Sequence, residues 1–527
     1  MSQAVNEPLT HIQRGLLKLP DEILLQILDL PGSPSHTRRE HAARLRLTCR
    51  RLRDVSSHWL VERTTVDMSR PETLRRFCGI AQNSAVARGV REVRLRLHYY
   101  HPWVASSIDN FTAAALAEWK GRLRYDGSSD YWRGQFPLDV TDMMNFFVRK
   151  LDKELGNDDA PLANALEISS AGAMPAVEKA YAAYKAGFDA QDAAMRDGLF
   201  LASFTEAFAA LPNWYTHTLT LFDCNTEDDE PAPWRYAQAD REDTAGQQEA
   251  VVRVLSRPML WEDARWIGTG DDIFRHVPVD MMIDVLVAMG QHDKAKVEHL
   301  RFFLTPAPDY TRLATDIERL RQLTDSVKAL DVFQFMFKPH SFKDLQEPTM
   351  ALSTKRFAEE MHVINRYLGA IAGAKTLGSF EVDFGQFCYS RGLSLDERKS
   401  PAPFGASFDW LPSEALGVVA LGRAALTLDD FRNIARSLPE ESCVDLYSVD
   451  LFKTSWREVL DVLRAECKAL RRITIWWPHG DADVLTENQR ESVFGHHWDT
   501  KPSRACRYVL GEDLANPLET VSGQVAE

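Results

Sequence analysis

A short pattern of hydrophobic positions recurs along this sequence, with apolar residues at positions one, four, six and eight of each copy. Alternation over the last positions of a copy is typical of a β-strand that buries one face. In the C-terminal half the copies start at 297, 327, 377, 416, 444 and 470, so successive starts are 30, 50, 39, 28 and 26 residues apart. Earlier copies start at 90 and 216. The pattern therefore predicts a series of strands spread over most of the chain.

Most of the gaps between these strands contain apolar residues at the helical period of three or four. They are Leu313, Ile317 and Leu320; Phe357, Met361, Ile364, Leu368 and Ile371; Leu428, Phe431, Ala435 and Leu438; and Val459, Leu460 and Leu463. Strand then helix at intervals of 26 to 30 residues resembles a degenerate leucine-rich repeat, without the Asn or Cys ladder that usually follows the strand. We predict a mixed α/β fold, an irregular leucine-rich-repeat-like α/β solenoid with helical insertions. The alternative is an α/β domain in which strands and helices simply alternate.

Residues 19–59 follow a different pattern, which predicts short amphipathic helices. Pro20 suits a first helical position, and Asp21 and Glu22 place negative charge at the exposed N–H groups of a first turn. Thr48 is a candidate cap for a later helix. Apolar residues recur before Pro31-Gly32 and again after a polar loop, and they are Ile23, Leu24, Ile27 and Leu28, then Leu45, Cys49, Leu52, Val55 and Trp59. A unit of about 45 residues cannot bury so many large side chains internally, so we expect another surface to cover them.

The sequence Leu-Pro-Asp-Glu-Ile-Leu at 19–24, followed by Thr-Cys-Arg-Arg-Leu at 48–52, resembles the F-box over residues 14–64. The F-box is a three-helix module that docks on the Skp adaptor of cullin–RING ubiquitin ligases. Here the loop after the first helix is long and basic, and Leu52 stands where Trp is common. The resemblance implies adaptor-binding side chains at Leu19, Pro20, Ile23, Leu24, Ile27, Leu28, Leu45, Leu47, Cys49 and Leu52. The alternative is that the first segment is an amphipathic helix of a larger core.

The domain organisation follows from these two patterns. We predict a disordered tail at 1–13, the F-box at 14–64 and a substrate-binding body at 65–510, followed by a second tail at 511–527. The body carries insertions at 98–215, where the signals are mostly helical, and at 223–243, which is acidic and rich in turn residues. A chain of 527 residues is long for one compact core, so a small module with a large body is the expected arrangement.

Composition narrows the classes of partner. The formal net charge of -14 gives no general attraction to nucleic acid. Residues 36–63 are a local exception, because eight Arg face only three acidic residues there. Adaptors of the Skp kind are acidic, so this excess either steers their association or forms a solvated helix face.

No segment indicates secretion, a membrane or a structural metal. The start of the sequence lacks a charged and apolar leader, and no stretch of about 18 apolar residues occurs. The seven cysteines contain no Cys-x-x-Cys pair, which argues against a disulfide framework and a zinc site. We expect a cytoplasmic or nuclear protein without a membrane partner.

Motifs for catalysis are absent or weak. The sequence contains no Gly-x-Ser-x-Gly, no phosphate-binding loop and no His-Glu-x-x-His. Residues 268–271 are a turn signal that lacks the third glycine of a dinucleotide site. Residues 479–483 and the pair His496-His497 are more typical of polar loops than of metal sites. We expect a chain that is not an enzyme and needs no cofactor or metal; the rival hypothesis is an enzyme within 98–290, which requires polar groups clustered in a pocket.

Stacked strands would turn the residues between the buried positions toward an open surface. Among these residues we select as substrate-binding candidates Arg94, Arg96, Arg301, Phe303, Phe333, Glu381, Arg472 and Trp476. The mixture of both charges with aromatic side chains is typical of the centre of protein interfaces. A slip of one residue in the register would turn each of these side chains inward.

The F-box resemblance and the open surface together predict a substrate-recognition subunit of a Skp–cullin–F-box ubiquitin ligase. Its N-terminal helices would bind the Skp adaptor and, through it, a cullin, while the body binds a protein substrate. Tethering would then replace a bimolecular encounter by a high effective concentration. The alternative is a protein-binding scaffold that has no role in ubiquitylation.

Overall fold

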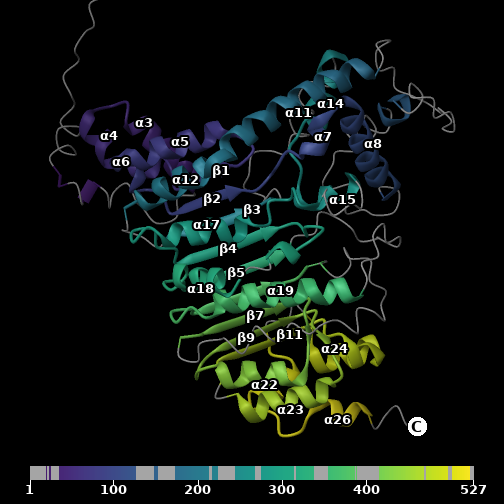
Figure 1. Ribbon diagram of the computed structural model, residues 1–527. Helices are drawn as coiled ribbons and strands as arrows, with labels where there is room; N and C mark the ends of the chain where they lie inside the picture. Colours follow the sequence, from purple (N-terminus) through teal and green to yellow (C-terminus); the bar gives the residue numbers. More distant parts are fainter. Residues whose placement is uncertain are drawn as a thin grey trace, which may run out of the picture.

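The computed structural model describes residues 19–20, 23–24, 35–125, 147–151, 173–212, 217–223, 244–267, 274–313, 316–337, 354–385, 387, 415–467, 470–496 and 501–522. Within these residues the fold is mixed α/β, with a nine-stranded sheet in which every neighbouring pair is parallel. The strands are β1 (Arg63–Asp67), β2 (Glu92–Arg96), β3 (Thr218–Phe222), β4 (His299–Leu304), β5 (Val332–Phe337), β6 (Ser379–Asp383), β7 (Val418–Gly422), β9 (Cys443–Tyr447) and β11 (Arg472–Trp476). They lie side by side in chain order, so the chain winds in one direction (Figure 1). The short strands β8 (Ala425–Leu426) and β10 (Asp450–Leu451) form a separate parallel pair.

Helices fill the connections between the strands. From the N-terminus to β3 they are α3 (Ser35–Leu45), α4 (Arg50–Ser56), the 3-10 helix η1 (Ser57–Trp59), α5 (Pro71–Gln82), α6 (Ser84–Ala87), α7 (Pro102–Ser106), α8 (Ile108–Tyr125), α11 (Met174–Met195), η2 (Arg196–Gly198) and α12 (Leu199–Ala209). After β3 come α14 (Thr244–Leu255), η3 (Trp261–Asp263), α15 (Ala264–Ile267), α17 (Met281–Gly290), η4 (Thr311–Leu313), α18 (Ile317–Ser326), α19 (Thr354–Ala372), α22 (Leu428–Ser437), α23 (Trp456–Glu466), η6 (Gly480–Val484), α24 (Glu487–Phe494), α25 (Arg504–Val509) and α26 (Pro517–Ser522). None of the helices in the described residues has the length and hydrophobicity that crossing a membrane requires.

The helices of the C-terminal half begin where local sequence dictates. Thr427 and Asp430 form a capping box at the start of α22, and Ser455 and Glu458 form another at the start of α23. In each box the two side chains accept hydrogen bonds from N–H groups that have no partner within the helix. These caps explain why both helices start immediately after a short loop.

One face of the sheet forms the core. Its two rows of buried side chains run across all nine strands in register, for example Leu300, Phe333 and Phe380 on β4, β5 and β6. Helices pack on this face: the ring centroids of Phe302 on β4 and Tyr367 on α19 lie 6.2 Å apart. The hydrophobic periodicity that predicted the strands therefore reports this buried face.

Most predicted strands are confirmed, and two are displaced. The copies starting at 90, 216, 297, 377, 416 and 470 coincide with β2, β3, β4, β6, β7 and β11. In β5 and β9 the buried pairs are Phe333 with Phe335 and Val444 with Leu446, three residues away from those that the pattern predicted. In β5 the pattern fits two registers, because the buried Val327 in the preceding turn also lies three positions before an apolar residue. In β9 the position three before Val444 is Glu441, so the pattern started only at Val444 itself. Strand β1 was not predicted, because it contains a single large apolar residue, Val66.

The helical insertion agrees with the prediction, whereas the C-terminal tail does not. The described part of 98–215 is mostly helical, as expected (Figure 1). Residues 1–13 and 224–243 lie outside the described residues. The prediction of a structureless tail from 511 is wrong as far as residue 522, because α26 contacts α23, α24 and α25 there and buries Leu518.

Candidate protein-binding surfaces

The N-terminal helices form a small unit at one end of the sheet, beside α5 (Figure 1). The N–H groups of Ile23 and Leu24 donate to the carbonyl of Pro20 at 3.1 and 3.0 Å, which marks a helical turn where the sequence predicted one. Helix α3 replaces part of the predicted polar loop; its sequence has no apolar stripe, so periodicity could not reveal it. The cap of α4 is Cys49, whose sulfur accepts from the N–H of Leu52, and not Thr48.

The predicted adaptor-binding residues divide between the inside and the outside of this unit. Leu24 and Leu52 are buried together with Ala42 and Val55, and none of the four belongs to the main core cluster of the body. Leu19, Leu45 and Cys49 are half-buried, Pro20 is exposed, and Ile27 and Leu28 lie outside the described residues. Ile23 is 39% and Leu47 88% exposed. Among the described residues of this unit, four apolar side chains are therefore buried outside the main core cluster, and two large aliphatic side chains face solvent.

The unit is attached to the body through η1 and α6. A Cβ atom added to Gly89, just after α6, would lie 1.5 Å from the carbonyl oxygen of His58 in η1. Only glycine permits this approach of two backbones, so Gly89 sets the distance between the N-terminal unit and the body.

The second surface is the sheet face opposite the core. In β4, β5, β6 and β9 side chains alternate strictly between buried and half-buried, and this face is accessible there. In β2 and β3 nearly every side chain is buried on both faces. The accessible surface thus extends over the strands from β4 to β11, and at the opposite edge β1 also leaves Arg63 exposed and Thr65 half-buried on this face.

Three of the predicted substrate-binding residues do not reach this surface. Arg94 and Arg96 point to the predicted face but are only 3% and 9% exposed, with guanidinium carbons 4.3 and 5.2 Å from the ring centroid of Phe222. The prediction that they are open to a partner is wrong, because β2 and β3 are covered on both faces. Phe333 is fully buried in the core, because the register of β5 differs from the predicted one. The remaining five lie on the predicted, accessible face of the sheet. Arg301, Phe303 and Glu381 are half-buried, and Arg472 and Trp476 are exposed.

The carboxyl ends of β7, β9 and β11 carry an aromatic cluster that sequence reasoning found only in part. Tyr447 and Trp476 are neighbours in register, and the rings of Tyr447 and Trp477 meet edge to face at 5.0 Å. The guanidinium carbon of Arg423 lies 5.2 Å from the Tyr447 ring centroid, and Arg423 also pairs with Asp383. We name Tyr447, Trp476, Trp477, Arg423 and Asp383 the aromatic end of the sheet.

Backbone geometry positions this cluster. The residues that follow β7, β9 and β11 at matching register, Arg423, Ser448 and Trp477, have φ angles of 50°, 50° and 48°. The left-handed conformation costs roughly 1–2 kcal/mol for a residue with a side chain. Trp477 would point to the buried face if β11 continued for one more residue in extended conformation. The turn of the backbone instead leaves Trp477 42% exposed.

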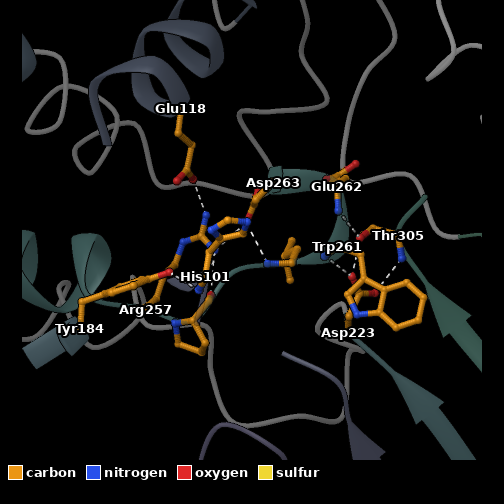
Figure 2. A network of polar contacts seen from close by, with 11 residues as sticks. His101, Glu118, Tyr184, Asp223, Arg257, Trp261, Glu262, Asp263 and Thr305 are labelled. Atoms are coloured by element: carbon orange, nitrogen blue, oxygen red, sulfur yellow. Dashed lines mark hydrogen bonds and ion pairs between the residues drawn. The ribbon is translucent and has the colours of Figure 1, made fainter. Parts of the chain in front are cut away.

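A buried network of polar side chains lies at the carboxyl ends of β3 and β4 (Figure 2). Asp223 follows β3 and accepts hydrogen bonds from the N–H of Trp261 at 2.8 Å and the N–H of Thr305 at 2.6 Å. Arg257 pairs with Glu118 of α8 and with Asp263, at 3.0 Å to the latter. The network therefore ties the helical insertions to the end of the sheet.

Burial governs the protonation of this network. It raises the pKa of Asp223 to about 7, although hydrogen bonds from Thr305 and Trp261 favour the ionised form. Burial alone would lower the pKa of Arg257, but the charges of Glu118 and Asp263 raise it above its usual range. Arg257 is therefore a permanently charged centre held by two carboxylates.

The network offers no room for a substrate. A cavity of about 30 Å³ lies beside Arg257, lined by Glu118, Tyr184, Asp263 and apolar side chains. Organic ligands occupy pockets of roughly 300 Å³ or more, whereas this volume holds about one water molecule. The polar groups around it contact one another, which gives them a structural role.

The weaker sequence motifs resolve into local contacts. His479 lies 3.2 Å from Asp483, whose other carboxylate oxygen accepts from the N–H of Gly480 in the same turn. His496 pairs with Glu491, and His497 lies outside the described residues. No three His, Cys, Asp or Glu side chains of the described segments are placed to hold a metal ion. Neither models of known protein families nor curated protein sequences match this chain.

Proposed function

We propose that this chain is the substrate-recognition subunit of a Skp–cullin–F-box ubiquitin ligase. The N-terminal helical unit binds the Skp adaptor, and the accessible sheet face binds a protein substrate. The chain contributes position and not chemistry, because tethering raises the effective concentration of the substrate at the ubiquitin-charged enzyme.

The observation that carries the proposal is the helical unit with apolar side chains buried outside the main core cluster and with exposed aliphatic side chains. The F-box resemblance depends on the segments 19–24 and 48–52. Ile23 lies in the first of them, and Leu47 lies immediately before the second. Single exposed aliphatic side chains occur on many protein surfaces, so it is their position in or beside the segments with the F-box resemblance that supports a docking site. Arg44, Arg50 and Arg53 are exposed on the same helices and suit an acidic adaptor.

The winding of the body supports the second half of the proposal. In doubly wound α/β domains the strand order reverses at one point, whereas here it follows the chain from β1 to β11. Successive helices such as α17, α18 and α19 contact each other in the same order. A leucine-rich-repeat-like solenoid has this arrangement, and such solenoids bind proteins on the strand face.

Capture of a Skp adaptor tests the proposal. We expect Ile23→Asp combined with Leu47→Asp to reduce co-purification of the adaptor at least tenfold, because two charges would enter an apolar interface. Leu514→Asp is the matched control, since Leu514 is 91% exposed on the C-terminal side of the body. Adaptor capture should be unchanged in the control.

Two results would contradict the proposal. Equal adaptor capture by the wild type and the double variant would remove the assigned docking site. Adaptor binding without a co-eluting cullin, and without accumulation of any bound partner when the chain is removed, would identify a scaffold instead.

A further inference from the structure

The aromatic end of the sheet stands out among the exposed apolar groups. Outside it, the large exposed apolar side chains of the described residues are all aliphatic: Ile23, Leu47, Leu199, Ile317, Val484 and Leu514. Trp476 and Trp477 are instead consecutive tryptophans, 38% and 42% exposed, next to Tyr447. Trp and Tyr are the residues most enriched where interfaces concentrate their binding energy.

Strand β7, beside this end, carries small residues. On the accessible face β7 presents only Val418, Ala420 and Gly422. Its neighbour β6 presents Glu381 and Asp383 at the levels of Ala420 and Gly422, and β9 presents Asp445 and Tyr447 at the same levels. Small side chains therefore separate two rows that carry carboxylates; at the level of Gly422 the side chain of Asp383 already lies 2.7 Å from where a Cβ would stand, whereas Ala420 lies between Glu381 and Asp445.

The carboxylates of this region differ in how they are neutralised. Glu381 accepts from the amide of Gln334 at 2.9 Å and the hydroxyl of Ser379 at 3.2 Å, both uncharged. Within the described residues no Lys, Arg or His forms an ion pair with Glu381. Asp445 pairs at 2.7 Å with Arg472, which is largely exposed and can turn aside. Strands two places apart in a sheet are separated by about 10 Å, so a long cationic side chain can lie between Glu381 and Asp445.

We propose that the accessible face from β6 to β11 binds a basic segment of a partner protein. A Lys or Arg side chain lies over Ala420 between Glu381 and Asp445, and a neighbouring residue packs on Trp476 and Trp477, whose ring faces attract cations. Charge complementarity selects this occupant: among the described residues Glu381 has only uncharged partners, and the chain as a whole carries a net charge of -14. An acidic segment would be repelled by the same carboxylates. The inference rests on the proposed function only in identifying this partner as a substrate.

Binding of defined peptides to the full chain tests the inference. The probes are fluorescein-labelled twelve-residue peptides of alternating Arg and Ser, or of alternating Glu and Ser, followed by fluorescence anisotropy at physiological salt. We expect saturable binding of the Arg peptide alone. Glu381→Gln and Trp476→Ala should each weaken it at least fivefold, while the thermal unfolding midpoint stays within a few degrees of the wild type.

Matched controls separate this site from general attraction to an acidic protein. Glu318→Gln and Ile317→Ala remove an exposed carboxylate and an exposed apolar side chain from α18, and they should change the affinity less than twofold. Equal effects of the control and site variants would overturn the inference, as would equal binding of the Glu peptide or no saturable binding of the Arg peptide. Adaptor capture is measured on the same variants. Normal capture without peptide binding overturns this inference alone, and peptide binding without capture by the wild type overturns the proposed function alone.

Discussion

At the scale of single residues, Asp223 shows how the fold changes the chemistry of a side chain. In the sequence it stands at the start of an acidic, turn-rich segment, where a solvated carboxylate is expected. In the structure it is completely buried between β3 and β4 and bonded to Trp261 and Thr305. Burial raises its pKa from 3.8 to about 7, so the folded chain holds a proton that the unfolded chain releases above about pH 4.

The pH dependence of stability follows from this shift. The folded state binds more protons than the unfolded state between about pH 4 and pH 7, so the contribution of Asp223 to stability falls as the pH rises through that window. Asp223→Asn cannot titrate, and its free energy of unfolding should therefore rise relative to the wild type from pH 4.5 to pH 7. Urea unfolding at several pH values measures this difference.

An exposed carboxylate provides the control. Asp293 is exposed in the turn after α17, and Asp293→Asn should not reproduce the rise in relative stability that Asp223→Asn shows. Parallel pH profiles for Asp223→Asn and the wild type would contradict the assignment of a protonated buried carboxyl.

At the scale of secondary-structure elements, register decides which face a side chain joins. Strand β5 carries Phe333, Phe335 and Phe337 on its buried face, and the ring of Phe333 lies 5.5 Å from that of Phe380 on β6. The hydrophobic pattern assigned Phe333 to the accessible face because it started three residues too early. Phe303 on β4 occupies the accessible face, as predicted.

Truncation of these two phenylalanines distinguishes the registers. Phe333→Ala should lower the free energy of unfolding by about 3–5 kcal/mol, since it opens a cavity in a packed core. Phe303→Ala, on a half-buried position, should cost roughly 1 kcal/mol. Denaturant unfolding measures both changes, and a loss for Phe333→Ala no larger than that for Phe303→Ala would favour the predicted register of β5, in which Phe333 lies on the accessible face.

At the scale of the whole molecule, the N-terminal unit joins the body where η1 contacts α6, and its four buried apolar side chains lie outside the main core cluster. Gly89 and the carbonyl of His58 define that contact. The C-terminal end of the sheet is closed differently, because α25 packs on β11 and buries Ala505 and Cys506. Terminal strands of a stack need such covers, since their outer edges would otherwise be open to pairing.

Substitution of Gly89 tests the attachment of the N-terminal unit. Gly89→Ala would place a methyl group inside the carbonyl of His58, so η1 and α4 should separate from the body and proteolytic cleavage between 46 and 62 should accelerate at least tenfold. Gly79→Ala on α5 is the matched control, because nothing lies within 4 Å of its added Cβ and alanine favours a helix by up to about 1 kcal/mol. Equal cleavage of the two variants would mean that the unit does not depend on this contact.

Local pattern in the sequence determined most of the strands, several helix starts and the mixed α/β class. Apolar residues at every second position located six strands, because each strand buries one face against helices. Residues such as Pro20 and the capping pairs before α22 and α23 set helix starts, since these interactions are confined to neighbouring residues. The adaptor-docking role of the N-terminal segment and the repeat character of the body stay predictions that the proposed experiments test.

Only the tertiary structure decided which of these faces remain accessible. The sequence around Arg94 and Arg96 resembles that around Arg301, yet the first two are buried because β2 and β3 are covered on both sides. The aromatic end likewise joins Asp383, Tyr447 and Trp477, which are far apart in the sequence. Burial, register between distant strands and the charges that meet across them depend on contacts between segments, and no local pattern carries that information.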